Sequence, residues 1–281
     1  MRLCEETRLS TAMRGDAAVG CGTLYGDCAN QSDSAFPPEG VVEAILGYRK
    51  WGVMKMQDML QFLSDLEKNN SLEWMAQNKK AYVSAKKAFV ALVQELVVRM
   101  GEVDDSIPLL NAGDLVFRLN RDTRFSKDKS PYNAAFRAHI APAGKLPVPV
   151  GYYISVAPGD RSFLGGGLFA PMFKDATARV RDHIAADGAA FEKIIGTPAF
   201  ERHFSIKGEA LKSVPNSYDA NHPQAEYLKN KSWYLEYPVA DSLMVDTQAF
   251  VNKAVTVFGL MKPFNQFLNS ALAGFRMPER K

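Results

Sequence analysis

The stretch V-P-V-G-Y-Y-I-S-V-A-P-G-D-R-S-F-L-G-G-G-L-F, residues 148–169, decides the fold that we expect for this chain. Large apolar residues occupy every second position from Val150 to Val156, which predicts a strand over Val148–Val156. Pro158-Gly159-Asp160 marks a tight turn, and Ser162–Phe169 is expected to return as the partner strand. A connection this short requires antiparallel pairing, since a parallel crossover needs about a dozen residues or more.

Three consecutive glycines, Gly165, Gly166 and Gly167, interrupt the second of these strands. Glycines inside a strand indicate a bulge, or a close approach by another backbone or by a ligand. Their spacing fits neither a Walker phosphate loop nor a dinucleotide fingerprint. All three are candidate ligand-binding residues, and a bulged strand without a ligand is the simpler alternative.

Helices are expected before this pair of strands, and helices with one late strand after it. Apolar residues at helical spacing predict a helix over 57–68, and Asn70 with Glu73 predicts a capping box for a long helix ending near Gly101. Further strands are expected at 115–119, 135–140 and 232–237, and further helices at 171–186, 189–195, 198–204, 224–230 and 241–258, the last capped by Asp241. Without regular βαβ alternation, this order predicts an α+β single domain with an antiparallel sheet of about four to six strands flanked by helices.

The ends of the chain differ from its body. Residues 1–54 are rich in Gly, Ser, Ala and Asp without periodicity, and we expect a disordered N-terminal extension. Because Met54 and Met56 stand just before the first amphipathic segment, an alternative is that translation starts there. The globular domain is expected over residues 55–262, followed by a C-terminal tail over 263–281.

Composition excludes several classes of protein. Of the 281 residues 47% are hydrophobic and 23% charged, which is typical of a globular chain, and the net charge of +3 is too small to predict nucleic-acid or membrane binding. No apolar run approaches the roughly 20 residues of a membrane span. Cys4, Cys21 and Cys28 fit neither a disulfide framework nor a zinc site. With no signal peptide, we expect a cytoplasmic protein, and no metal site or particular cofactor is indicated.

The most concentrated charge lies in F-R-L-N-R-D-T-R-F-S-K-D-K-S-P-Y, residues 117–132. Guanidinium groups match phosphate or carboxylate oxygens in pairs, so this basic stretch is a candidate anion site. Its candidate ligand-binding residues are Arg118, Arg121, Arg124, Ser126, Lys127, Lys129 and Tyr132. The alternative is a solvated loop whose arginines pair with acidic residues of the protein.

A second constellation lies in Y-D-A-N-H-P, residues 218–223. Asp219 could orient His222 as a general base, and both are candidate catalytic residues. The alternative is a turn initiated by Asp219. The other histidines form no metal-ligand spacing.

Several of these motifs together resemble the DUF2461 family of uncharacterised proteins. The resemblance rests on the runs at Asn69–Tyr82, Arg121–Tyr132, Gly151–Tyr153, Phe163–Leu168 and Tyr218–Pro223. It covers about residues 57 to 260 in consistent order, with a departure at Met75, where the family pattern has an aromatic residue. It implies one contiguous domain in which the basic stretch, the glycines and the Asp–His turn belong together, and it implies no activity.

Three functions follow as hypotheses. The first is a protein that binds, and could act on, a phosphate-bearing or otherwise anionic small molecule at the basic stretch. The second is a nucleic-acid-binding module that uses the same stretch with exposed aromatic residues. The third is a protein-interaction domain whose arginines are structural. Whether the protein is an enzyme stays open at this point.

Overall fold

A computed structural model of the chain describes residues 56–169 and 171–278. The predicted extension over residues 1–54, with its three cysteines and the possible start at Met54, lies outside the described residues. Every described residue belongs to the unit formed by Pro37–Lys281.

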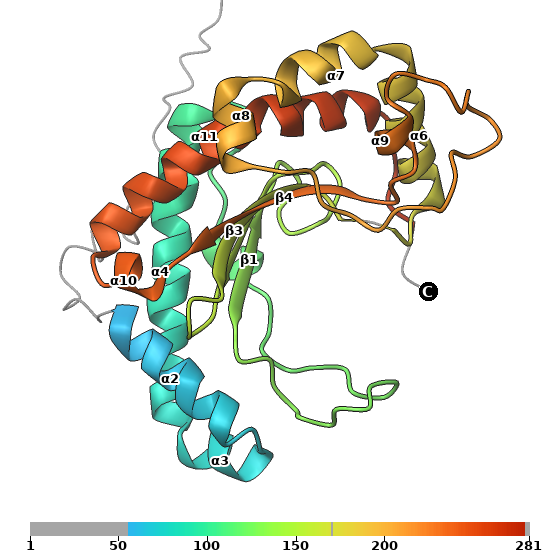
Figure 1. The fold of residues 1–281 in the computed structure, drawn as a ribbon. Coiled ribbons are helices and arrows are strands. Elements are labelled where there is room, and N and C mark those ends of the chain that lie inside the picture. Colours follow the sequence, from blue (N-terminus) through green and yellow to red (C-terminus); the bar gives the residue numbers. More distant parts are fainter. Residues whose placement is uncertain (1–55, 170, 279–281) are drawn as a thin grey trace, which may run out of the picture. The chain divides into compact units, whose positions relative to one another are not determined.

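The order of elements is helices, three strands, helices, one strand and helices (Figure 1). Before the sheet come α2 (Met56–Lys68), α3 (Leu72–Gln77), α4 (Lys79–Val103) and α5 (Ala112–Leu115). Then follow β1 (Phe136–Ile140), β2 (Tyr152–Val156), β3 (Ser162–Leu168), α6 (Lys174–Ala186), α7 (Gly188–Ile195), α8 (Pro198–His203), α9 (Ala225–Leu228), β4 (Trp233–Val239), α10 (Asp241–Met244) and α11 (Thr247–Ala271).

The strands form one antiparallel sheet in the order β1-β2-β3-β4. Tyr153 of β2 lies opposite Gly165 of β3, and Gly167 lies opposite Tyr234 of β4. The expected α+β class with an antiparallel sheet of four strands and flanking helices is confirmed.

One face of the sheet is covered by α4 and α11, which lie together on the same side of it in Figure 1. The residues on that face alternate along each strand as the sequence predicts: Tyr152, Ile154 and Val156 of β2 are all buried. The Tyr152 hydroxyl donates a 2.6 Å hydrogen bond to the buried Asp104, just after α4. This bond ties β2 to the end of the long helix beneath it.

Helix α11 lies against β3 at Gly166. A methyl group at Gly166 would come within 3.0 Å of the Met261 sulfur and 3.1 Å of Asn265 Oδ1, so the absent side chain lets the helix approach. Asn265 is buried; its Oδ1 accepts from the Gly167 N–H at 2.8 Å and its Nδ2 donates to the Gly151 carbonyl at 3.0 Å. Asn269, one turn later, binds the backbone of Val150 twice: its Oδ1 accepts from the Val150 N–H and its Nδ2 donates to the Val150 carbonyl. Two amides thus join α11 to the ends of two neighbouring strands.

The predicted long helix is divided. Asn78 ends α3 and precedes α4, and the hydroxyl of Ser71, rather than Asn70, caps α3 by accepting from Trp74 N. The Asn70 amide instead exchanges two hydrogen bonds with the backbone of Tyr132, at 2.9 and 3.0 Å. A tertiary contact 62 residues away has replaced the predicted local cap.

Two other boundaries differ from the prediction. The segment 115–119 is not a strand: Leu115 ends the short helix α5, and within the segment only Val116 forms an isolated bridge, with Ala138. Helix α11 begins after Asp246, which caps it, and continues through Pro263 to Ala271, so the expected boundary at residue 262 falls inside a helix. The exposed Pro263 is tolerated because the buried residues on both sides of it fix the helix by packing.

We expect Asn265→Ala to lower the free energy of unfolding by about 2–4 kcal/mol, because it leaves the Gly167 N–H and the Gly151 carbonyl without their partner. Urea denaturation measures the change. The matched control is Gln266→Ala, an exposed amide on the same helix, for which we expect a change within about 0.5 kcal/mol. Equal losses in the two variants would contradict the role given to Asn265.

Candidate functional site

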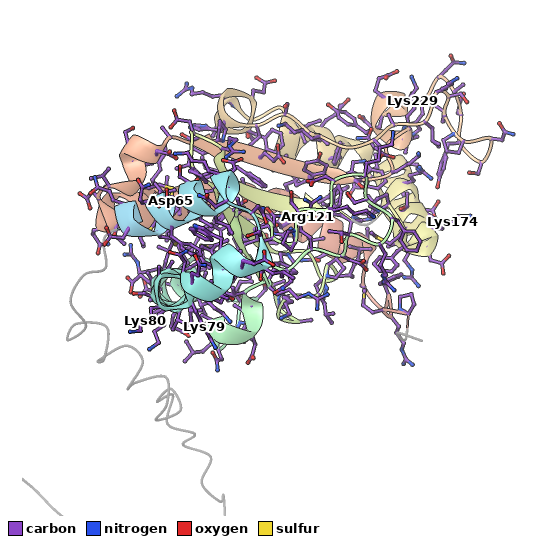
Figure 2. All side chains as sticks on the ribbon, turned by 90° about the horizontal axis from the view of Figure 1, so that it is seen from below. Asp65, Lys79, Lys80, Arg121, Lys174 and Lys229 are labelled. Atoms are coloured by element: carbon purple, nitrogen blue, oxygen red, sulfur yellow. The ribbon has the colours of Figure 1, made fainter. Side chains whose placement is uncertain are left out.

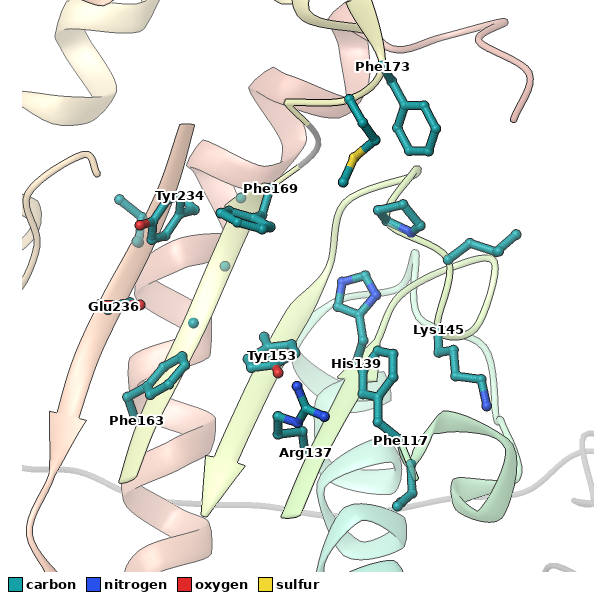
Figure 3. A pocket seen from close by; sticks show the side chains of 18 of the residues that line it. Phe117, Arg137, His139, Lys145, Tyr153, Phe163, Phe169, Phe173, Tyr234 and Glu236 are labelled. Atoms are coloured by element: carbon teal, nitrogen blue, oxygen red, sulfur yellow. The ribbon is translucent and has the colours of Figure 1, made fainter. Parts of the chain in front are cut away.

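The face of the sheet opposite α4 and α11 borders a cavity of about 1660 Å³ (Figure 3). Its floor is the sheet itself, because the residues that point to it alternate with the core residues along each strand. The polar residues around it are Lys86, Arg118, Arg137, His139, Lys145 and Glu236, with Tyr153 and Tyr234 contributing both ring and hydroxyl.

Aromatic rings form much of the cavity wall. Phe117, Tyr153 and Phe163 stand in a row: their neighbouring ring centroids are 6.2 Å and 5.7 Å apart, and the second pair is stacked. Beyond the glycines, Phe169 and Tyr234 meet edge to face at 5.4 Å. Such walls suit the flat face of an organic ligand.

The glycines of β3 lie between these two aromatic groups. In Figure 3 the glycine positions of β3 lie between Phe163 and Phe169, and all three glycines border the cavity. Gly166 accommodates α11, as described above. Gly167 has φ of 90° and its backbone lies so close to Trp233 that a methyl group would come within 2.3 Å of the Trp233 carbonyl oxygen. The predicted close approach of another backbone therefore occurs at Gly167, whereas Gly166 makes room for side chains of α11.

The charges that line the cavity are mostly positive. Lys86, Arg118, Arg137 and Lys145 stand against one carboxylate, Glu236, which is already paired with Lys207 at 2.6 Å. Within residues 56–169 and 171–278, none of the four lining cations forms a salt bridge. The arrangement favours an anion.

Arg137 is the cation most deeply set in this wall. Its guanidinium lies 5.8 Å from the ring centroid of Phe117 and beside Tyr153 (Figure 3). Its Nε atom is buried and has no hydrogen-bond partner. Among the described residues, two other buried side-chain polar atoms have no hydrogen-bond partner, Arg181 Nε and Asp241 Oδ1, and neither residue lines this cavity. An unpaired buried donor is costly, so an acceptor from a ligand would stabilise it.

His139 is buried at the same wall, opposite Tyr153 on the neighbouring strand. Burial lowers the pKa of His139 to about 4, and hydrogen bonds with the backbone of Lys145 and Leu146 offset this only in part. Burial also raises the pKa of the Tyr153 hydroxyl, against the influence of Arg137. Both groups are therefore neutral near pH 7, and the positive charge around the cavity comes from its lysines and arginines.

The basic stretch after Arg118 forms a loop in which both arginines are paired with aspartates of the same loop. Arg121 pairs with Asp128, and Arg124 grips Asp122 with two hydrogen bonds of 3.0 and 2.6 Å. The Arg124 guanidinium lowers the pKa of Asp122 to about 2. Figure 2 shows Arg121 well apart from other surface cations such as Lys79 and Lys229, each on its own part of the molecule.

The other members of this predicted set have local roles or none. The Lys129 ammonium donates to the Thr123 carbonyl at 2.9 Å, and Ser126 is a long 3.5 Å partner of Arg121. Lys127 is exposed, and Tyr132 is held through its backbone by Asn70. Of the stretch, Arg118 borders the cavity; Arg121, Arg124, Ser126, Lys127, Lys129 and Tyr132 are not among the residues that line it.

Asp219 and His222 also lie outside the cavity wall. Asp219 Oδ1 accepts from the Asn221 N–H at 2.9 Å, which makes the predicted turn. His222 Nδ1 accepts from the Gln224 N–H at 3.0 Å, and Nε2 lies 3.1 Å from the Ala185 carbonyl, so the neutral ring with its proton on Nε2 satisfies both contacts. These bonds join α6 to the segment before α9 and favour the structural alternative for both residues.

The comparison with known families agrees with these motifs. The model of the family described as conserved hypothetical protein (DUF2461) matches residues 58–267.

The chain belongs to the DUF2461 family.

The match runs from α2 to most of α11, so the basic loop, the Asp–His turn and all of the cavity lining except Met277 and Pro278 lie within the family's region. Searches of curated proteins and of solved structures found no match to the chain.

Over residues 56–169 and 171–278, no three His, Cys, Asp or Glu side chains come close enough together to hold a metal ion. In the same ranges every helix is too short or too polar to cross a bilayer.

We expect the buried His139 to make the protein less stable in mild acid. Above pH 6.5 the ring is neutral in both states and adds no pH dependence. Between pH 6.5 and about 4 the unfolded chain binds a proton that the folded protein excludes, so stability falls as pH falls, by about 3 kcal/mol in total.

Urea denaturation of the wild type and of His139→Gln across this range measures the effect. The difference in unfolding free energy between the two proteins should change with pH in this window and be constant above it. A constant difference throughout would contradict a buried, neutral His139.

We expect His222→Ala to lower the free energy of unfolding by about 1–3 kcal/mol, since it orphans the Gln224 N–H and the Ala185 carbonyl. Asn221→Ala, in the same turn but with its exposed side chain outside these bonds, should change it by no more than about 0.5 kcal/mol. A His222→Ala protein as stable as the wild type would remove the structural interpretation.

Proposed function

We propose that this protein binds a small organic anion in the cavity on the open face of its sheet. The observation that carries the proposal is the buried, unpartnered Nε of Arg137 in a wall whose one carboxylate is already neutralised. A carboxylate or phosphate oxygen is the natural acceptor for such a donor, and charge-assisted bonds of this kind are the stronger ones.

This anion site lies on the sheet and not in the basic loop, where the sequence predicted it. Within the loop, Arg121 and Arg124 already have carboxylate partners, which supports a structural role for them. Arg118 and the three glycines are the sequence candidates that the cavity retains. Arg137 takes the anchoring role that the sequence had given to the loop.

The size of the cavity supports a ligand with an organic body. Ligand sites are typically about 300–1,000 Å³, and 1660 Å³ is far larger than a bare phosphate or sulfate requires. Aromatic walls around Arg137 would bury the apolar part of such a ligand and strengthen the ionic contact by excluding water.

Single-stranded nucleic acid is the second candidate. Aromatic side chains on an open sheet face, with cations beside them, are also the means by which such proteins stack bases. Binding of this kind weakens steeply with salt, in proportion to the phosphates neutralised. A one-anion site loses far less affinity between low and high salt.

We expect Arg137→Met to weaken the binding of small organic phosphates or carboxylates by about 10- to 100-fold, because it removes charge-assisted hydrogen bonds while keeping an apolar side chain of similar length. A thermal-shift screen of mononucleotides, sugar phosphates and aromatic carboxylates identifies ligands, and calorimetry then gives the affinities.

The control is Arg124→Met, which removes an exposed arginine already paired within the loop and should leave affinity unchanged. Three results would count against the proposal: no ligand in the panel, equal affinity in Arg137→Met and the wild type, or a loss in Arg124→Met alone. The last would return the anion to the loop.

A further inference from the structure

The fold gives a reason for two of the three glycines of β3, and none for the third. Gly166 admits α11, and Gly167 has a backbone conformation and a neighbouring carbonyl that exclude a side chain. Gly165 has neither constraint. A methyl group there would meet the Leu235 carbonyl oxygen at 3.2 Å and Tyr153 Cβ at 3.4 Å, so the neighbouring strand would have to give by a few tenths of an ångström to admit it.

A methyl group on Gly165 would also point into the cavity. Its next neighbour would be the Phe163 ring at 3.7 Å, and the rings of Phe163 and Tyr153 both line the cavity. The absent side chain at Gly165 therefore leaves bare backbone on the cavity floor, and this strip continues through Gly166 and Gly167, which also border the cavity. Positions two residues apart in a strand, such as Gly165 and Gly167, are separated by about 7 Å, which matches the width of a six-membered ring with its substituents.

Aromatic side chains stand on both sides of this strip. Tyr153 lies on the neighbouring strand directly opposite Gly165 and is stacked on Phe163. Tyr234 lies opposite Gly167 on the other side, in edge-to-face contact with Phe169. A flat ring lying on the strip would contact peptide groups beneath it and ring edges or faces around it.

Resting on the proposed anion site, we infer that the ligand carries a flat aromatic or heteroaromatic ring that lies on the Gly165–Gly167 strip while its anionic group bonds to Arg137. The strand that carries Arg137, β1, is two strand spacings from β3, about 10 Å. A mononucleotide and a two-ring aromatic acid both have this chemistry and about this reach. An aliphatic or compact anion has the charge without the ring.

Two matched pairs of probes test the ring separately from the charge. AMP and ribose 5-phosphate share a phosphate, and only the first has a base; 2-naphthoate and its fully saturated analogue share a carboxylate, and only the first is flat. We expect the ring-bearing member of at least one pair to bind about tenfold or more tightly in calorimetry, and the pair that shows the difference identifies the source of the ring.

Gly165→Ala should place a methyl group on the cavity floor and remove the tighter binding of the ring-bearing probe. The ring-bearing probe should then bind about as weakly as its ringless partner, whose own affinity is unchanged. Gly259→Ala is the control, because a methyl group there meets only Val103 at an ordinary 3.5 Å, away from the cavity. If Gly165→Ala does not fold, Phe169→Leu replaces it: this ring is 61% exposed, so its loss affects the wall more than the fold.

The outcomes separate the two proposals. Failure of every probe to bind overturns both the anion site and the ring. Binding of both members of each pair with equal affinity, or an undiminished ring advantage in Gly165→Ala or its substitute Phe169→Leu, overturns the ring and leaves the anion site standing. Tighter binding of a single-stranded oligonucleotide than of AMP, with a steep salt dependence, overturns the small-molecule reading in favour of nucleic acid.

Discussion

The contact between α11 and the middle of β3 is the constraint on which the rest of this structure depends. The helix can approach the sheet because Gly166 has no side chain, and Asn265 then provides the hydrogen bonds that Gly167 and Gly151 cannot obtain from neighbouring strands at that point. Leaving a buried peptide group without a hydrogen-bond partner costs free energy of folding. A displaced helix would lose the Asn265 bonds, so this amide fixes the position of the helix on the sheet. The core beneath the sheet follows from it.

Because α11 is fixed on one face of the sheet, the side chains that point to the other face are determined as well. Strand residues alternate, so the positions between Phe136, Ala138 and Ile140 on β1 must point away from the core, and they carry Arg137 and His139. The aromatic and cationic side chains of this face are grouped around a cavity. In the same strand, Gly166 admits the helix below the sheet and Gly165 leaves the cavity floor above it without a side chain.

The sequence predicted the fold better than the site. Alternation along Val150–Val156 gave the buried face of β2 correctly, because packing follows directly from period-two spacing. Arg137 and Tyr153 were not singled out, although they occupy the opposite phase of correctly predicted strands. Their meeting depends on β1 pairing with β2, which is a long-range choice that no local pattern encodes. The caps at Asn70 and Asp241 were wrong for a similar reason, since tertiary partners replaced local ones.

The basic stretch illustrates why charge counted along a sequence differs from charge available in a fold. Asp122 and Asp128 are the two acidic residues of the stretch, and each lies within seven positions of the arginine with which it pairs. Their pairs and the Asn70 contact to Tyr132 give the loop an internal structure. That structure holds the preceding residues in place, so Phe117 stacks under Arg137 and Arg118 stands at the cavity edge. The stretch therefore contributes to the site mainly through position: Arg121 and Arg124 are paired within the loop, and the unpaired Arg137 donor lies on the sheet.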